Sequence, residues 1–179
     1  MAYNGADHLN AIERKLIDVL TTGTYDTTSG PEQAWATNQI TVYGQFPTTT
    51  ETNYPCIIVE MTANGIEEQF MGQNLTFGAG ATAAKGELYG VGFNIHILID
   101  NKSSIEIGPG GSTEFYKGRR LLNYIMLNCA NILMDCNFSS TTTEVTERHY
   151  TGFRDMGYNP ELEIWASLCS MVVVFKNNR

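Results

Sequence analysis

The first regular pattern in the chain is a run of apolar residues three or four positions apart near the N-terminus, which predicts an amphipathic helix. Asp7 is the expected N-cap, because its carboxylate can accept hydrogen bonds from the first free backbone amides. Residues 21–23 (TTG) are the expected end of the helix. The positions predicted to face the core are Leu9, Ile12, Leu16, Val19 and Leu20.

A second pattern, the alternation of apolar residues with small or polar ones, predicts strands in the middle of the chain. The clearest is residues 87–99, where apolar side chains share one face and Gly90, Gly92, Asn94 and His96 share the other. Residues 54–61 form an earlier, β-branched strand, and a short strand is expected over 39–43. Asn64-Gly65 predicts a tight turn, so residues 66–76 are expected to fold back as a hairpin partner.

Helical spacing returns after a predicted loop over residues 100–111. Ser112 is the expected N-cap of this second helix, which ends near Asn137. Residues 141–158 then predict a polar strand or hairpin arm, and residues 162–175 predict the last strand. The apolar stripe of the helix comprises Phe115, Gly118, Leu122, Ile125, Cys129, Ile132 and Cys136.

The order helix, three strands, helix, two strands indicates an α+β fold. Two helices are expected on one face of a mainly antiparallel sheet, giving a two-layer sandwich. We find no internal repeat and no domain boundary, so residues 1–179 are interpreted as one domain. The connections 24–53 and 72–86 are long for a compact fold and are the expected contact surfaces.

Composition and charge argue against several classes of protein, namely membrane-spanning, nucleic-acid-binding and secreted proteins. Hydrophobic residues are 42% of the 179, enough for a core, and no apolar run approaches the roughly 20 residues that cross a bilayer. The formal charge of -8 argues against nonspecific electrostatic binding to the phosphate backbone of nucleic acids. The N-terminus lacks the pattern of a secretory or transit peptide, so synthesis in a cytoplasm is expected.

No catalytic or metal-binding constellation emerges from the motifs. His8, His96 and His149 show no metal-ligand spacing, and His96 is interpreted as a hydrogen-bonded sheet residue. All four cysteines, Cys56, Cys129, Cys136 and Cys169, are expected to be buried free thiols, and Cys129 and Cys136 fall on the apolar stripe. Residues 80–86 fail the phosphate-loop pattern, and residues 108–113 are explained by helix capping. We therefore expect no enzyme activity, no cofactor and no metal.

A cluster of charges and an acidic arm are the remaining polar features. Lys117, Arg119 and Arg120 gather at the start of the second helix, where they form a solvated edge or contact an acidic neighbour. Glu144, Glu147, His149 and Asp155 crowd one segment, and a solvated, salt-bridged strand is the better interpretation.

Taken together, these elements resemble the tail terminator family of tailed bacteriophages. The resemblance is one of pattern and covers nearly the whole chain. The matching residues are the helix 9–20, the strand Tyr54-Pro55-Cys56-Ile57-Ile58-Val59-Glu60, the strand 89–99 with Asp100 at its exit, the helix 115–136, the arm Tyr150-Thr-Gly-Phe153-Arg154-Asp155 and the strand 162–175.

The resemblance implies a structural virion protein without an active site. Such a subunit closes into a six-fold ring at the head-proximal end of the tail tube, stops tube polymerisation and presents a surface to the neck. The implied partners are further copies of the chain, the tail tube protein, the neck (stopper) protein and, in a contractile tail, the sheath. The resemblance also implies a place in the virion tail, no membrane partner, and assembly in the cytoplasm of the host bacterium.

The segments 24–53 and 77–86 are longer than in compact members of that family. They leave open a contractile-tail variant, or a head-to-tail connector or other tail protein of the same particle. DNA is expected to pass through the ring without specific binding, because carboxylates facing the lumen would repel phosphate. The interface candidates are Gly78, Ala79, Gly80 and Lys85 in the Gly/Ala segment, and Lys117, Arg119, Arg120, Arg154 and Asp155.

Overall fold

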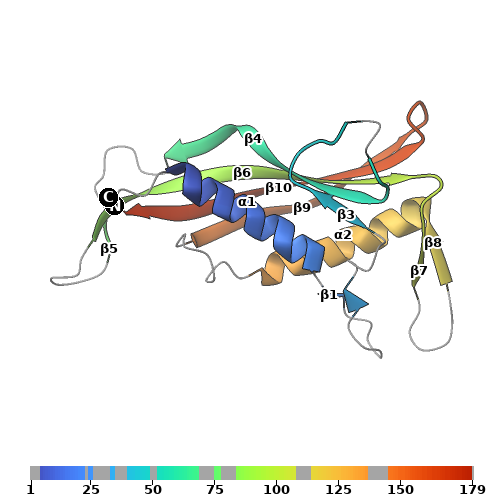
Figure 1. The fold of residues 1–179 in the computed structure, drawn as a ribbon, viewed down its shortest axis with the longest axis horizontal. Coiled ribbons are helices and arrows are strands. Elements are labelled where there is room, and N and C mark those ends of the chain that lie inside the picture. The colour runs from blue at the N-terminus through green and yellow to red at the C-terminus, as the bar shows by residue number, and fades with distance from the viewer. Residues whose placement is uncertain are drawn as a thin grey trace.

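A mixed α+β fold with one long sheet and two helices is seen in the computed structural model (Figure 1). The structure describes residues 5–22, 24–25, 33–34, 40–48, 52–68, 75–77, 84–107, 114–136 and 145–178. The two helices are α1 (Gly5–Thr22) and α2 (Gly118–Asp135). The strands are β1 (Thr24–Tyr25), β2 (Gln33–Ala34), β3 (Thr41–Tyr43), β4 (Cys56–Glu68), β5 (Leu75–Phe77), β6 (Ala84–Asp100), β7 (Ser104–Ile107), β8 (Glu114–Lys117), β9 (Val145–Asn159) and β10 (Ile164–Asn178).

The main sheet has the strand order β3-β4-β6-β10-β9, and β5 pairs with the beginning of β6. Every pairing in it is antiparallel except that of β3 with β4. The strands β1 and β2 form one small hairpin, and β7 and β8 form another. The predicted two-layer, mainly antiparallel architecture is confirmed.

Both helices pack against the same face of the main sheet, as Figure 1 shows. The alternation in β6 decides this arrangement, because every second residue from Val91 to Ile99 is fully buried. Ile12, Leu16 and Leu20 of α1 meet these side chains, which confirms the first predicted helical stripe. From α2 the buried residues are Leu121, Leu122, Ile125, Asn128, Cys129 and Leu133.

The turn predicted at Asn64-Gly65 is wrong, because β4 continues through both residues to Glu68. Met61 pairs with Phe93 and Ile66 pairs with Val91, so residues 62–65 of β4 lie opposite Gly92 alone. The two strands therefore stay paired on both sides of this irregularity, and the chain does not reverse there. The strand that folds back on β6 near this end is the short β5.

The predicted start of the second helix is also wrong. Phe115 belongs to β8 and is 60% exposed, and the helix begins at Gly118, with Lys117 rather than Ser112 at the N-cap. Gly118 has a φ of +50°, which glycine adopts without strain, and this allows a strand to lead directly into a helix. A Cβ at that position would lie 3.2 Å from Nε1 of Trp165.

Two smaller predictions, the N-cap of the first helix and the loop 100–111, are also wrong. Asp7 lies inside α1, which begins at Gly5, so it is not the N-cap. The predicted loop 100–111 contains β7, whose partner β8 follows residues 108–113. The sequence signal for this hairpin was the alternation of Ile105 and Ile107 before a Gly-rich stretch.

Neither described helix is long and apolar enough to cross a membrane.

Candidate interaction surfaces

Four of the predicted interface residues lie in the Gly/Ala segment. Gly78, Ala79 and Gly80 are outside the described residues, and Lys85 lies in β6, where its backbone pairs with Thr76 of β5. The described residues on either side of 78–83 belong to β5 and β6, which pair antiparallel. The role of the Gly/Ala segment in binding a tube or a neighbouring subunit stays a prediction.

The other predicted interface residues gather around the N-terminal end of α2. Nη2 of Arg119 donates to Oδ2 of Asp155 in β9 at 3.0 Å. The second oxygen of Asp155 accepts from the backbone amide of Gly157 at 2.8 Å, which orients the carboxylate. Two residues that the sequence suggested separately are thus brought together across 36 positions by the packing of α2 on the sheet.

Arg120, the next residue of α2, is held by β8. Its guanidinium lies 4.0 Å from the ring centroid of Tyr116 and donates to Oε2 of Glu114 at 2.5 Å. Arg119 and Arg120 are both exposed, so these exposed pairs contribute little to stability. Lys117 and Arg154, also exposed, form no ion pair among the described residues. These two cations are available to a partner.

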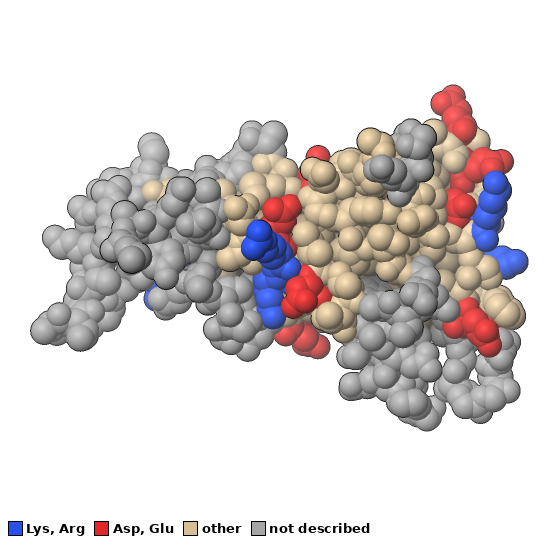
Figure 2. Space-filling view, viewed as in Figure 1, with Lys and Arg blue, Asp and Glu red and all other residues tan. Residues whose placement is uncertain are grey.

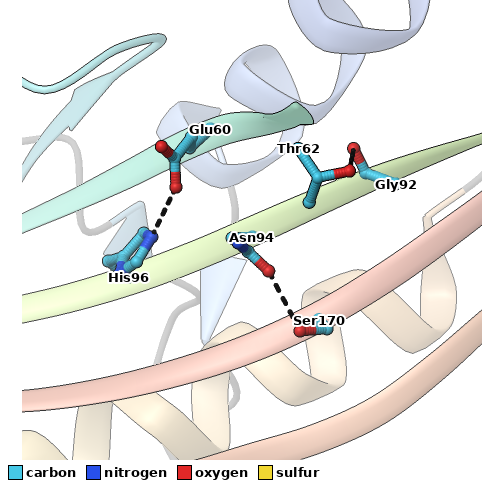
Figure 3. Close-up of polar contacts among 6 residues, drawn as sticks. All are labelled: Glu60, Thr62, Gly92, Asn94, His96 and Ser170. Atoms are coloured by element: carbon cyan, nitrogen blue, oxygen red, sulfur yellow. Dashed lines mark hydrogen bonds and ion pairs between the residues drawn. The ribbon is translucent and has the colours of Figure 1, made fainter. Parts of the chain in front are cut away.

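The face of the sheet opposite the helices carries a row of polar side chains from β4, β6 and β10 (Figure 3). Nε2 of His96 lies 3.1 Å from Oε2 of Glu60, and Oγ of Ser170 donates to Oδ1 of Asn94 at 3.0 Å. The ring of Phe46 packs edge-on against His96, with centroids 4.9 Å apart. The prediction of His96 as a hydrogen-bonded sheet residue is confirmed.

This row links neighbouring strands and leaves no side chain poised as a nucleophile beside a base. Within the described part of the chain, no group of three His, Cys, Asp or Glu residues could hold a metal ion. His149 pairs with Glu147 at 3.3 Å on the exposed side of β9, as expected for a solvated, salt-bridged strand. The register pairs His96 with the apolar Ile58 and Leu168, so this face combines the polar row with apolar side chains.

The four cysteines are free and buried, as predicted. Burial raises the pKa of the Cys56 thiol to about 12 and that of the Cys169 thiol to about 11. Burial also raises the pKa of Cys129 well above its usual value. Because thiolate is the reactive form, these side chains are packing groups rather than nucleophiles.

Sequence reasoning missed Arg148, although the structure gives it a clear role. From β9 it donates to the backbone carbonyl oxygens of Met134 and Cys136 at the end of α2. The available signal was indirect, since the last turn of α2 has no basic residue of its own. Sequence reasoning also missed the exposed apolar residues of α2 and of the turn between β9 and β10. For Leu127 and Met134 of α2, the spacing of seven residues was visible in the sequence.

Comparison with known proteins adds no family to this description. No protein-family model matches the chain, and no curated protein matches it.

Proposed function

We propose that this chain is a structural subunit of a bacteriophage tail, which assembles into a ring at the head-proximal end of the tail tube. There it ends tube polymerisation and provides the surface that joins the neck. The observation that carries the proposal is the chain order of the two helices and the strands on the path of the main sheet, α1-β3-β4-β6-α2-β9-β10, which matches the two-layer sandwich that the resemblance implies. The proposed hexameric state comes from that resemblance.

The distribution of charge supports a protein that works through contacts with protein. Figure 2 shows charged side chains gathered over α1 and at the end of the molecule that carries β7, β8 and the turn between β9 and β10, with a broad uncharged area between them. Surfaces depleted of charge are typical of interface centres. The net charge of -8 also suits a lumen through which DNA passes without binding.

The proposal is tested by adding the purified protein to polymerising tail tube protein from the same phage. We expect a native mass of about six times 19.8 kDa, rings with an open centre, and tubes that stop growing with a ring at one end. The control adds the protein after the tubes have formed, when the ends are capped but the lengths are unchanged.

Two outcomes would contradict the proposal. Tubes that grow to the same length with and without the protein, and show no added density at their ends, would exclude tail termination. Binding to the head or neck complex but not to tubes would favour the alternative, a head-to-tail connector of the same particle.

A further inference from the structure

The outward face of α2 is unusual for a solvent-exposed helix because it is uncharged along most of its length. No charged residue occurs between Arg120 and Asp135. Leu127 is 63% exposed and Met134 is 56% exposed, and their spacing of seven residues places them on one face. The exposed residues of α1, in contrast, include Arg14 and Asp18. Asn123 and Asn131 are the other exposed residues of the outward face of α2, so that face is uncharged and partly apolar, and depletion of charge is typical of interface centres.

A second exposed apolar patch lies at the turn between β9 and β10, which we call the hairpin tip (residues 156–166). Figure 1 shows this hairpin projecting beyond the body of the molecule. Met156 is 55% exposed and Leu162 is 65% exposed, and the exposed Glu161 and Glu163 flank Leu162. An open groove of about 550 Å³ is lined by Met156, Gly157, Tyr158, Asn159, Pro160, Glu161 and Ala166.

The hairpin tip is fixed in shape by local hydrogen bonds. Oδ1 of Asn159 accepts from the backbone amides of Glu161 and Leu162, at 2.9 Å and 3.2 Å. Asn101 donates from its backbone to the carbonyl oxygen of Glu163 at 3.2 Å and from its side chain to the hydroxyl of Tyr158 at 2.6 Å. A turn held in this way loses little conformational freedom on binding.

The two patches of one chain cannot cover each other. The hairpin lies beside the start of α2, where Asp155 bonds Arg119 and Trp165 lies under Gly118. At 1.5 Å per residue, Leu127 is about 10 Å and Met134 about 21 Å further along the helix than Arg120. Two different patches on one subunit are what a repeated head-to-tail contact requires, since each subunit gives one patch and receives the other.

We propose that the hairpin tip of one subunit docks on the outward face of α2 of a second copy of this chain. Leu162 and Met156 lie against Leu127 and Met134 of the second copy. The charges are complementary, because the acidic Glu161 and Glu163 approach the basic N-terminal end of α2, where Lys117 forms no ion pair within the described chain. The inference rests on the proposed ring and supplies its subunit contact.

Two double variants, each removing one patch, test this contact. The tip variant is Met156→Ser with Leu162→Ser, and the helix variant is Leu127→Gln with Met134→Gln. All four side chains are more than half exposed, so the subunit is expected to stay folded, as circular dichroism would verify. Each variant should associate at least roughly tenfold more weakly than the native chain in sedimentation velocity.

Phe46→Ser is the matched control, because Phe46 is also exposed and apolar but lies on the opposite face of the sheet, against His96. It should assemble like the native chain. The decisive measurement mixes the tip variant with the helix variant in equal amounts. The intact tip of one and the intact helix face of the other should then form a one-to-one dimer that cannot grow.

The possible results of these experiments test the subunit contact and the proposed function independently. The contact would be overturned if either variant assembled as well as the native chain, or if the mixture remained monomeric. A ring formed by the native chain would then have to use another contact. Native assembly into an open chain that the variants abolish would support the contact and contradict ring closure. A native chain that stays monomeric at every concentration would overturn the contact, and tube capping would then decide the function independently.

Discussion

Arg148 joins the edge strand of the sheet to the end of the second helix. The last carbonyl groups of any helix lack partners within it and carry a partial negative charge. In α2 no basic residue of the last turn compensates for this, so the guanidinium of Arg148 from β9 binds the carbonyl oxygens of Met134, at 2.9 Å, and Cys136. One side chain therefore fixes the end of α2 relative to β9.

Substitution Arg148→Met should lower the free energy of unfolding by about 1–2 kcal/mol, because two charge-assisted hydrogen bonds at a partly exposed site are lost. Urea titration followed by far-ultraviolet circular dichroism measures this. Arg154→Met is the control, since Arg154 is an exposed arginine of the same strand whose side chain forms no hydrogen bond or ion pair among the described residues. Equal losses in the two variants would show that capping of α2 contributes nothing.

At the scale of elements, the meeting of β4 and β6 at Gly92 shapes the sheet. Oγ1 of Thr62 donates to the carbonyl oxygen of Gly92 at 3.3 Å (Figure 3). A Cβ on Gly92 would lie 2.6 Å from that same Oγ1, so only glycine allows the two strands to approach here. The register between β4 and β6 shifts at this point, where residues 62–65 bulge out.

Gly92→Ala should therefore cost about 1–2 kcal/mol of stability in the native background, because the threonine must move and its hydrogen bond is lost. In a Thr62→Ala background the same substitution should cost clearly less, since the colliding atom is gone. A double-mutant cycle by chemical denaturation gives the coupling energy between the two positions. An equal cost of Gly92→Ala in both backgrounds would contradict the close approach.

The elements also show how far the sequence alone predicts this molecule. The alternation in β6 and the helical period of α1 identify both elements, because the burial of one face directly dictates the pattern. Asn64-Gly65 misleads, since pairing with β6 extends β4 through residues that favour a turn. The contact of Arg119 with Asp155 could not be predicted, because it depends on how α2 lies across β9, for which no local pattern exists.

At the scale of the whole molecule, the two faces of the sheet have different roles. One face builds the core with α1 and α2, and the other presents the polar row of Glu60, Asn94, His96 and Ser170. The hairpin tip and the outward face of α2 add two further surfaces at different places. A subunit of 179 residues thus offers several surfaces at once, as the proposed contacts with a neighbour, a tube and a neck would require.

The buried thiols on both faces of the sheet should limit the stability of the whole domain at alkaline pH. Folding raises the pKa of Cys56 to about 12 and of Cys169 to about 11, from 9.0. The folded state therefore holds these protons more tightly, and the stability present below about pH 9 is lost as the pH rises through the folded values. Urea titrations should show a loss of at least about 1 kcal/mol between pH 8 and pH 10. The double variant Cys56→Ala/Cys169→Ala, though less stable at pH 7, should decline less steeply, and an unchanged slope would assign the effect to other groups.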